Sequence, residues 1–564
     1  MPKITIDGRE CEFQPGQLIL QVANANKVAV PQYCYHDGLS VVASCRICLA
    51  EVWQPNPRNN NKLEPLMGGK LLPTCQTQCA EGMVVYTDSP RAVANQKAVM
   101  EYLLINHPLD CPVCDQAGEC FLQDYSYEYG RGQSRFEETK LKQPKKDLGP
   151  HIYLYADRCI MCTRCVRFTR EVTGTAELLV SGRGNREEID VFPGQALDNE
   201  LSANVADLCP VGALLDKDFL FAQRVWFLKE TPSIDGITAS GDNISIHHNE
   251  GKVYRIKPRT NMAVNKWWIT DEVRYGWKFI HREDRLGPAT GGPQRKQFGV
   301  PVQTDLPRAV SDTVSGLRAA VTAGKRTAVI VSPMLSCEEA FVLAKAALAI
   351  DAKAFLAVGP VPVMGQDKTF PPNKPDGFKM YAEKCPNSRG VRRVLEALSA
   401  ATPHNGYVAT FEQITNQLAS GEIGAALITG NYPSTWATDA FVKAVEGKFI
   451  ALLDTLPSAL SDRADIVIPG ATWAEKAGCF QNARNMLQAF EAAIPVRDGC
   501  TPEGQTALEI LAEATGAKAA GLFNAADVRQ QMAATGPALR PFATDVSLPV
   551  ADVTQEADME VVEL

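Results

Sequence analysis

The chain has 564 residues, of which 45% are hydrophobic and 22% are charged, and its formal net charge is -8. This length predicts about three to five domains, and the mildly acidic charge argues against a nucleic-acid-binding surface. A run of about 18 apolar residues is missing, so the sequence predicts no membrane span. The start, MPKITIDGRECEF, has neither an apolar signal core nor an arginine-rich presequence, which favours a cytoplasmic or already processed protein.

The first 85 residues predict a small β-rich domain. Alternating runs on either side of Asp7-Gly8 indicate a β-hairpin, and QLILQVANAN after it has helical spacing. The proline- and asparagine-rich insertion QPNPRNNNKLEP indicates an exposed loop, and MVVYTD predicts a closing strand. Ser89 followed by Pro90 is typical of a helix start, and the predicted helix RAVANQKAVMEYLLI ends at a cysteine-rich motif.

The rest of the chain predicts further modules. A polar, proline-bearing linker over 133–150 precedes a cysteine-bearing module, and a small β domain with a hairpin at 249–251 follows that module. We interpret the glycine- and proline-rich stretch 281–301 as a domain boundary. Beyond residue 305, strands such as RTAVIVS alternate with helices such as CEEAFVLAKAALAI, which predicts βαβ units around a mostly parallel sheet. The acidic tail after about 540 is expected to be frayed.

The cysteines are concentrated at the front of the chain. Thirteen of the 17 lie within residues 1–209, and four lie in the remaining 355 residues. Disulfides suit small secreted scaffolds, whereas this chain is large and has no secretion signal. Metal or cluster ligation is therefore the better interpretation.

The first cysteine set has the spacing C-x10-C-x2-C-x26-C and consists of Cys34, Cys45, Cys48 and Cys75. A close pair on a tight loop with one distant ligand is typical of plant-type 2Fe-2S sites. Zinc also accepts four thiolates, but structural zinc sites usually pair two short C-x2-C motifs. By spacing alone Cys79 is a rival for the last position. We expect Cys11, inside a strand, to act as a small buried hydrophobe.

A later set combines CIMCTRC with a remote Cys-Pro and consists of Cys159, Cys162, Cys165 and Cys209. This pattern is known from bacterial ferredoxins, where three thiolates on a short loop bind one 4Fe-4S cluster. A second C-x2-C-x2-C run is missing from the sequence, so Cys209 is expected to complete the same cluster. A redox-active disulfide between Cys162 and Cys165 is the weaker alternative.

Between these two sets lies HPLDCPVCDQAGEC, which offers His107, Cys111, Cys114 and Cys120. Zinc readily binds sets of three cysteines and one histidine, so this motif alone favours zinc. Its position between two iron-sulfur patterns reverses that preference and indicates a 4Fe-4S cluster with one imidazole ligand. His107 must be neutral to bind a metal.

Together these motifs resemble the family of the 75 kDa iron-sulfur subunit of respiratory complex I, the NADH-quinone oxidoreductase of bacteria. The resemblance is carried by SCRICLAEV, LLPTCQTQCAEGM, NHPLDCPVCDQAGECFLQD, DRCIMCTRCVRF, SGRGN and LCPVGAL, which cover the first 215 residues. It implies one 2Fe-2S cluster, two 4Fe-4S clusters and a true ligand at His107. It also implies Cys75 rather than Cys79 as the last ligand of the binuclear cluster.

The resemblance implies an α+β and α/β multidomain fold. The expected domains are a β-grasp 2Fe-2S ferredoxin-like domain (1–85), a 4Fe-4S module with one histidine and three cysteines (86–132), a four-cysteine 4Fe-4S ferredoxin-like module (151–225), a small β domain without a cluster motif (226–282) and a degenerate molybdopterin-oxidoreductase-like domain (305–540).

Two departures from the family pattern modify this expectation. Some bacterial members carry a further cluster motif after the third set, whereas TPSIDGITASGDN has no cysteine, so that cluster is expected to be absent. The second half resembles molybdopterin oxidoreductases but is much shorter and has no obvious metal-ligating site. No molybdopterin is expected, and Cys337, Cys385, Cys479 and Cys500 are expected to be isolated thiols.

The function implied by the resemblance is electron relay from a flavin-bearing, NADH-oxidising subunit toward quinone, with no flavin or nicotinamide site on this chain. Electrons would pass from the 2Fe-2S cluster to the Cys159 cluster, then to the His107 cluster, and leave to a ferredoxin-like 4Fe-4S subunit. Quinone-site subunits are further implied partners, and the implied location is peripheral, on the cytoplasmic face of the inner membrane.

Several alternatives remain. The chain could be a diaphorase-type iron-sulfur subunit of an NAD-linked hydrogenase or formate dehydrogenase. An iron hydrogenase would need a second clustered cysteine set downstream, and a molybdenum-dependent formate dehydrogenase would need bound molybdenum. A zinc-stapled assembly scaffold is the non-redox alternative.

Overall fold

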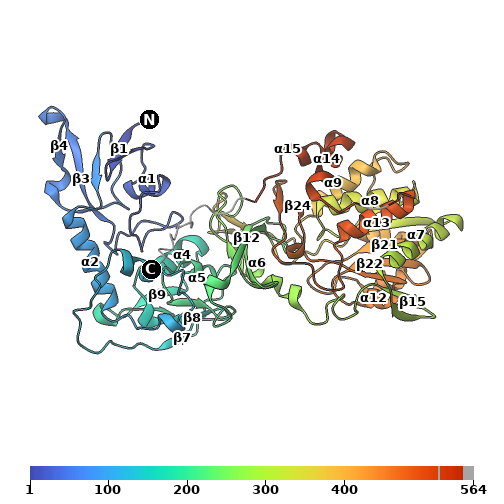
Figure 1. Ribbon diagram of the computed structural model, residues 1–564, viewed down its shortest axis with the longest axis horizontal. Coiled ribbons are helices and arrows are strands. Elements are labelled where there is room, and N and C mark those ends of the chain that lie inside the picture. Colours follow the sequence, from blue (N-terminus) through green and yellow to red (C-terminus); the bar gives the residue numbers. More distant parts are fainter. Residues whose placement is uncertain (519–520, 550–564) are drawn as a thin grey trace, which may run out of the picture. The chain divides into compact units, whose positions relative to one another are not determined.

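The computed structural model describes residues 1–518 and 521–549, which form two compact units (Figure 1). The first unit contains Met1–Leu228 together with Phe370–Gly377, and the second contains Lys229–Thr369 and the described residues from Phe378 onward. The end of the acidic tail, 550–564, which was expected to be frayed, lies outside the described residues. Within the described ranges, none of the helices combines the length and apolarity needed to cross a bilayer.

The N-terminal domain is a mixed sheet with strand order β2-β1-β6-β3-β4, and β5 (Leu72–Pro73) also pairs with β3. Strands β1 (Lys3–Ile6) and β2 (Arg9–Glu12) form the predicted hairpin, with Asp7 and Gly8 at φ 48° and 81°. Strand β6 (Val84–Tyr86) runs parallel to β1. Helix α1 (Ile19–Ala25) contributes Ile19 and Leu20 to the core of this sheet. The predicted β-grasp arrangement is confirmed.

The insertion after β3 is a hairpin rather than the loop expected from its composition. Strand β3 (Leu49–Asn56) pairs antiparallel with β4 (Lys62–Pro65), so only the tip is irregular. At the tip Asn60 and Asn61 adopt φ values of 49° and 54°, which asparagine tolerates better than most residues. The prediction was wrong because exposed polar strands lack the hydrophobic alternation by which strands are recognised.

Short elements connect the cysteine motifs of the first unit. Helix α2 (Pro90–Leu104) begins as predicted, since Ser89 Oγ accepts a hydrogen bond from the backbone N–H of Ala92 at 3.3 Å. The remaining elements are α3 (Phe121–Glu128), β7 (Lys145–Asp147), β8 (Ile152–Tyr155), α4 (Arg164–Phe168), β9 (Leu178–Ser181), β10 (Glu188–Val191), α5 (Asn204–Leu208) and β11 (Leu214–Asp216). Strand β8 lies between β7 and β11 in a three-stranded sheet.

The second unit starts with a three-stranded antiparallel sheet of β12 (Lys229–Ile234), β13 (Asn243–Asn249) and β14 (Lys252–Pro258). The predicted hairpin at Asn249-Glu250-Gly251 is confirmed. This sheet shares a hydrophobic core with β24 (Gly478–Gln481) and β25 (Leu487–Phe490), to which Ile244, Trp473 and Phe490 contribute.

The large sheet of the second unit has strand order β16-β15-β23-β22-β21-β17-β18. Five neighbouring strands are parallel, and they are β17 (Arg326–Val331), β18 (Phe355–Val358), β21 (Ile423–Thr429), β22 (Phe449–Asp454) and β23 (Ile466–Pro469). At one edge lies an antiparallel hairpin of β15 (Gln294–Gln297) and β16 (Val300–Gln303). The interpretation of 281–301 as a boundary was therefore wrong for its second half, whose polar residues form an edge strand.

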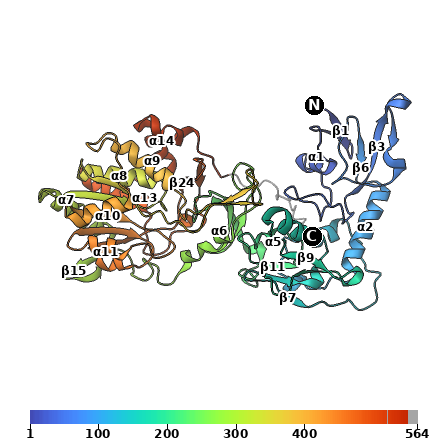
Figure 2. The ribbon, with the colours of Figure 1, turned by 180° about the vertical axis from the view of Figure 1, so that it is seen from behind.

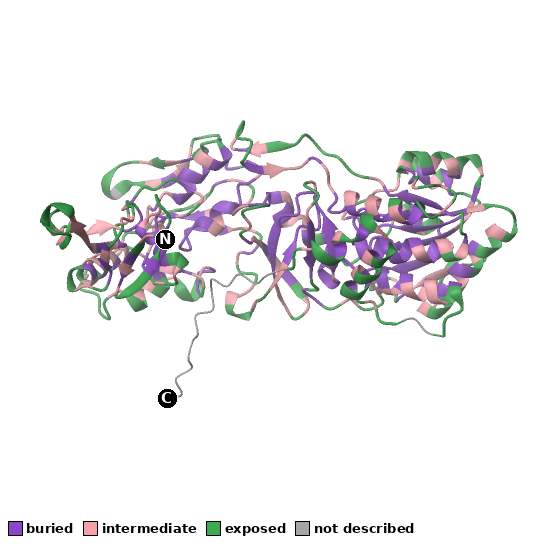
Figure 3. Cartoon of the chain, turned by 90° about the horizontal axis from the view of Figure 1, so that it is seen from above, coloured by how far each residue is buried: buried purple, intermediate pink, exposed green. Residues whose placement is uncertain are grey.

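Helices cover both faces of this sheet (Figure 2). One face packs on α7 (Leu306–Thr322), α8 (Cys337–Ile350), α9 (Ser388–Ser399), α13 (Glu503–Thr515) and α14 (Ala525–Thr535). The other face packs on α10 (Phe411–Ser420), α11 (Asp439–Ala444) and α12 (Ala459–Arg463). The central strands are buried on both sides (Figure 3), as is typical of parallel sheets. The predicted α/β fold is confirmed.

Candidate iron-sulfur sites

The fold brings the first cysteine set together, and Cys48 and Cys75 belong to the core of the N-terminal domain. The Cys34 thiol lies next to the thiols of Cys45 and Cys75, and the Cys75 thiol also lies next to that of Cys48. Cys34 and Cys75 are only 1% exposed. The backbone N–H groups of Ser44 and Cys45 donate to Cys34 Sγ, which is the way a loop holds cluster ligands.

Cys79 lies away from this group. Its neighbour is Cys11 rather than Cys34, and burial raises the pKa of its thiol to about 11. Cys11 is buried in β2, as expected. The contacts of Cys75 with Cys34 and Cys48 therefore favour Cys75 as the fourth member of the first set.

The third cysteine set lies on a loop that wraps around its own thiols. Met161 and Thr163 adopt left-handed φ values of 51° and 58°, which curl the C-x2-C-x2-C loop. The Met161 backbone N–H consequently donates to Cys159 Sγ at 3.4 Å. The Cys209 thiol is close enough to Cys159 and Cys162 to add to the effect of burial on their pKa values, so the remote cysteine lies at the same site. Burial raises the pKa of Cys159 to about 12 and that of Cys162 to about 11.

The second set lines one small cavity, to which all four predicted residues contribute: His107, Cys111, Cys114 and Cys120. Burial, followed by the charge of Arg158, lowers the pKa of His107 to about 4. Its imidazole is therefore neutral at pH 7, which is the form that binds a metal. Burial raises the pKa of Cys120 to about 11. Cys111 is the exposed member of the set.

The third set adjoins both of the others. Arg167, two residues after Cys165, donates to the carbonyl oxygens of Cys34 and Cys162. On the other side, Gly212 lies so close to the second set that a Cβ built there would be 2.3 Å from Cys114 Sγ. The third site is thus joined to the first by a side chain and to the second by direct backbone packing.

The first and second sets also meet through aromatic side chains. Tyr33, next to Cys34, packs against Tyr125 of α3 with ring centroids 5.2 Å apart. Burial raises the pKa of Tyr33, and the nearby thiols of Cys120 and Cys45 add to this effect. This contact gives a direct connection between these two sets that does not involve the third.

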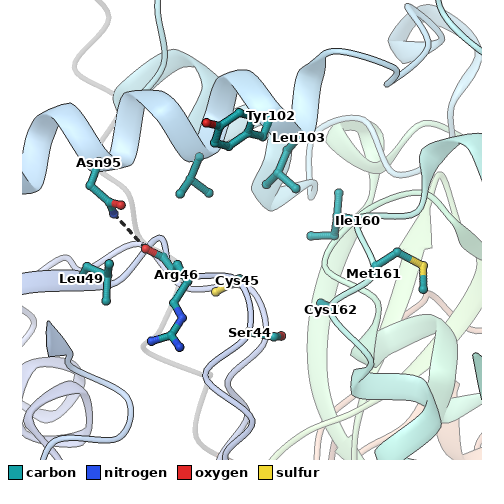
Figure 4. A pocket seen from close by; sticks show the side chains of 11 residues that line it. Ser44, Cys45, Arg46, Leu49, Asn95, Tyr102, Leu103, Ile160, Met161 and Cys162 are labelled. Atoms are coloured by element: carbon teal, nitrogen blue, oxygen red, sulfur yellow. Dashed lines mark hydrogen bonds between the residues drawn. The ribbon is translucent and has the colours of Figure 1, made fainter. Parts of the chain in front are cut away.

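A pocket of about 610 Å³ separates helix α2 from the loops of the first and third sets. Cys45 and Cys162 both line it, from opposite sides (Figure 4). Asn95 Nδ2 donates to the Arg46 carbonyl oxygen at 2.9 Å and ties α2 to the loop of the first set. One member of the first set and one member of the third set thus face the same opening.

The donor chemistry fits iron-sulfur clusters. Each set offers four soft or imidazole donors, and backbone N–H groups point at the sulfurs. Within 1–518 and 521–549, no three His, Cys, Asp or Glu side chains are arranged to hold a single ion. A cluster differs from a single ion because its ligands are distributed over several irons. Since burial keeps most of these thiols protonated, cluster binding must release protons.

Three residues next to the cysteines were not singled out from the sequence. They are Arg164 and Arg167, which lie inside the motif DRCIMCTRCVRF, and Gly212 in LCPVGAL. A signal for the arginines existed, since positive residues interleaved with cluster ligands are candidates for charge compensation. The sequence did not indicate a role for Gly212, because its spatial neighbour Cys114 is distant in sequence.

The segment 231–243 does not fit a cluster. Its loop is organised around the buried carboxylate of Asp235, which accepts hydrogen bonds from the backbone N–H groups of Ile237 and Thr238 and from the hydroxyl of Ser240. In a cluster site, backbone N–H groups of the loop donate to the cluster sulfurs. Here the N–H groups of Ile237 and Thr238 donate to the Asp235 carboxylate instead. The segment contains no cysteine.

The molybdopterin-like domain also lacks a fit to its cofactor. In open α/β sheets, ligands bind at the carboxyl ends of strands where the strand order reverses, which here is between β17 and β21. Met334 and Tyr432 follow these strands and form a buried apolar cluster with Cys385. The Tyr432 hydroxyl donates to the Pro360 carbonyl oxygen at 2.7 Å. Side chains therefore pack at the strand ends where sheets of this kind usually bind ligands.

The prediction that all four late cysteines are isolated thiols was wrong for two of them. The thiols of Cys337 and Cys479 lie next to each other, because the start of α8 packs against β24. The Cys337 thiol donates to Asn387 Oδ1 at 3.3 Å. Cys385 lies beside Tyr432, and Cys500 lies beside Arg285.

The fold and the three cysteine sets define the first unit as an iron-sulfur protein. Comparison with family models supports this class. The 2Fe-2S iron-sulfur cluster binding domain matches 2–90, the NADH-ubiquinone oxidoreductase-G iron-sulfur binding region matches 96–135, and the NADH-quinone oxidoreductase subunit 3 ferredoxin-like domain matches 149–215. The NDSU1/NuoG-like 4Fe-4S domain matches the cysteine-free segment 228–278, and molybdopterin oxidoreductase matches 396–501.

More particularly, the curated relatives are complex I subunits, and the resemblance stated from the sequence is confirmed. A subunit of the NADH-quinone oxidoreductase of Rickettsia felis is 40% identical over 277 residues, which are 49% of this chain and 39% of that protein. The mitochondrial NADH-ubiquinone oxidoreductase 78 kDa subunit of Neurospora crassa is 42% identical over 301 residues, 51% of this chain and 39% of that protein. The chain thus spans about two fifths of the length of these relatives.

A chain from the crystal structure of NAD+-reducing [NiFe]-hydrogenase in the H2-reduced state is 27% identical and covers 40% of this chain and 91% of its own length. Its TM-score of 0.34 is too low to support an argument.

Proposed function

We propose that this chain is an iron-sulfur electron-transfer subunit of an NADH:quinone oxidoreductase, relaying electrons from an NADH-oxidising flavin subunit toward quinone. The observation that carries the proposal is that three sets of four Cys or His side chains lie in one compact unit. Arg167 links the third set to the first, and Gly212 packs against Cys114 of the second. The similarity to complex I subunits over about half of the chain supports the same function.

The proposed ligands follow the three sets. The first set, with four cysteines, holds the 2Fe-2S cluster, and its members are Cys34, Cys45, Cys48 and Cys75. The third set, also with four cysteines, holds one 4Fe-4S cluster through Cys159, Cys162, Cys165 and Cys209. The second set, with one histidine and three cysteines, holds the other 4Fe-4S cluster through His107, Cys111, Cys114 and Cys120.

The clusters, when bound, supply one-electron redox chemistry, and the chain supplies burial, spacing and hydrogen bonds to sulfur. Burial of Cys34 and Cys75 shields these two thiols of the first site from water, and the Met161 N–H donates to Cys159 Sγ at the third site. Donors of this kind stabilise the extra negative charge of a reduced site, which raises its potential.

We propose the order first set, third set, second set for electron passage. The order is supported by Arg167, which joins the first and third sets, and by Gly212, which lies against Cys114. The rival is the direct aromatic contact between Tyr33 and Tyr125. Replacing Cys162 with Ser in the intact complex separates the two: the account predicts that NADH then reduces the first site but not the His107 site. Reduction of the His107 site in that variant would support the rival.

We propose that neither 226–282 nor the molybdopterin-like domain holds a redox group. Support comes from the Asp235-centred loop and from the packing of Tyr432 and Met334 at the strand-order reversal. Elemental analysis of the purified complex is expected to find molybdenum well below one atom per chain. A stoichiometric amount of molybdenum would overturn this part of the proposal and favour a formate dehydrogenase.

The proposed partners are a flavin-bearing NADH-oxidising subunit, a ferredoxin-like 4Fe-4S subunit and quinone-site subunits. The proposed location is peripheral, on the cytoplasmic face of the inner membrane and bound through the complex. Anaerobic purification from native membranes tests both, and flavin- and quinone-site subunits are expected to co-purify. Co-purification with nickel-iron hydrogenase subunits would instead favour the diaphorase alternative.

A further inference from the structure

Two buried guanidinium groups lie between the first and third cysteine sets. Arg164 and Arg167 belong to α4, the short helix that carries the ligand Cys165. They are only 6% and 8% exposed. Arginine is rarely buried unless its charge is compensated, so the environment of these two residues needs an explanation.

Arg167 connects the backbones of two proposed ligands. Its Nη2 donates to the Cys34 carbonyl oxygen at 2.5 Å and to the Cys162 carbonyl oxygen at 3.3 Å. Its Nη1 donates to the Ser40 carbonyl oxygen at 2.5 Å. One planar group thus fastens the loop of the first set to the loop of the third, across 133 sequence positions in the case of Cys34.

Arg164, three residues before Arg167 in α4, also lies near the first and third cysteine sets. Its Nη1 donates to the carbonyl oxygen of Leu208, the residue before Cys209, at 3.4 Å. The ionisable groups close enough to act on it are the thiols of Cys162, Cys209 and Cys34 and the guanidinium of Arg167.

The positive charge of this pair has no carboxylate partner in the described parts of the chain. All hydrogen bonds found for the two arginines go to backbone carbonyl oxygens, and the Nε atoms of both are buried without an acceptor. Burying an uncompensated charge is strongly unfavourable, whereas a negative group nearby offsets the cost. Four thiolates give an iron-sulfur cluster a net negative charge, and such a cluster is proposed on each side of the pair.

We propose that Arg164 and Arg167 are the shared counter-charge of the 2Fe-2S site and the Cys159 site, and that they raise the reduction potentials of both while leaving the His107 site unaffected. The inference rests on the proposed function and adds two positioning residues to it. Its physical basis is that a fixed positive charge stabilises the more negative, reduced form of each neighbouring site. Arg167 additionally fixes the distance between the two sites by bonding to both loops.

A redox titration followed by electron paramagnetic resonance tests the inference on the intact complex. Arg167→Gln removes the positive charge but keeps a planar hydrogen-bond donor, the side-chain amide, on a shorter side chain. The reduced-to-oxidised ratio at a fixed potential is expected to fall about tenfold at both sites, which is about 59 mV for a one-electron couple. The lysine variant Arg167→Lys retains the charge and is expected to shift both ratios far less, although the magnetic interaction between the sites changes.

Arg224→Gln provides the matched control. Arg224 Nη1 donates to the Cys114 carbonyl oxygen at 2.8 Å, so this arginine contacts the second set instead. Its replacement is expected to move only the His107 signal. Arg164→Gln repeats the test from the other guanidinium if Arg167→Gln fails to assemble.

Three outcomes would overturn the inference: unchanged potentials at both sites, a shift at one site only, or an equal shift with Arg167→Lys and Arg167→Gln, which would make the role structural. These outcomes leave the wild-type signals intact and are therefore distinct from failure of the proposed function. That failure would appear as missing 2Fe-2S and 4Fe-4S signals in the wild-type complex.

Discussion

The packing of Gly212 against Cys114 gives a sharp prediction for Gly212→Ala. The added Cβ would lie 2.3 Å from Cys114 Sγ and 3.0 Å from Gln116 Cβ. An ordinary carbon-sulfur contact is about 3.7 Å, so the sulfur or the backbone must move by more than about 1 Å, and overpacking of this kind costs about 1–3 kcal/mol. Gly212 is not in the left-handed region of φ, so the effect is steric and not a result of backbone strain.

The prediction distinguishes the cluster that lies near Gly212 in space from the cluster whose ligand lies near Gly212 in sequence. Gly212 follows Cys209 of the third set by three residues, yet its Cβ would disturb a ligand of the second. We expect retention of the His107 cluster to weaken about 5- to 150-fold, which corresponds to that energy, while the Cys159 cluster persists.

Electron paramagnetic resonance and iron content of the purified variant measure this. Gly132→Ala is the matched control, because nothing lies within 4 Å of the added Cβ. Selective loss of the Cys159 signal, or three unchanged signals in Gly212→Ala, would refute the packing argument.

Three further predictions follow from the described contacts. Cys75→Ser is expected to abolish the 2Fe-2S signal, whereas Cys79→Ser is expected to leave it unchanged. The reason is that, of these two cysteines, only Cys75 contacts Cys34. Equal spectra of the two variants would contradict this. Lys476 is buried between Glu339 and Glu503 at 2.9 and 2.6 Å, so Lys476→Met should destabilise the second unit by about 3–5 kcal/mol in chemical denaturation, and a loss below about 1 kcal/mol would argue against a tight network. Burial raises the pKa of Asp235 to about 6 from 3.8. The folded state then keeps a proton that the unfolded chain has lost between about pH 4 and 6, so stability should fall as pH rises through this window. Asp235→Asn should lack that slope in tryptophan-monitored denaturation, and an identical slope in both proteins would count against the assignment.

Local features were predictable from the sequence because their causes are local. The Asp7-Gly8 turn, the Ser89 cap and the hairpin at Glu250-Gly251 depend on a few adjacent residues, and all three were predicted. The family resemblance also came from short motifs. The closely spaced cysteines of each set could be grouped from loop spacing in the same way. For the remote fourth member of the first set, spacing alone could not decide between Cys75 and Cys79.

The features that escaped prediction depend on contacts between distant segments. The hairpins β3–β4 and β15–β16 are held by sheet neighbours, and their polar sequences read as loops. Arg167 meets Cys34 and Cys337 meets Cys479 only after the chain has folded. The sharing of one core by Ile244 and Trp473 has the same origin.

The most direct test of the account is a count of the clusters in the anaerobically purified complex. Electron paramagnetic resonance with iron and sulfide analysis should find one binuclear and two tetranuclear signals from this chain, which account for about ten irons of the complex's total. In His107→Ala, one tetranuclear signal should change and the other two signals should remain. Zinc in place of iron at the second set, or an unchanged spectrum in His107→Ala, would contradict the assignment of three linked iron-sulfur sites.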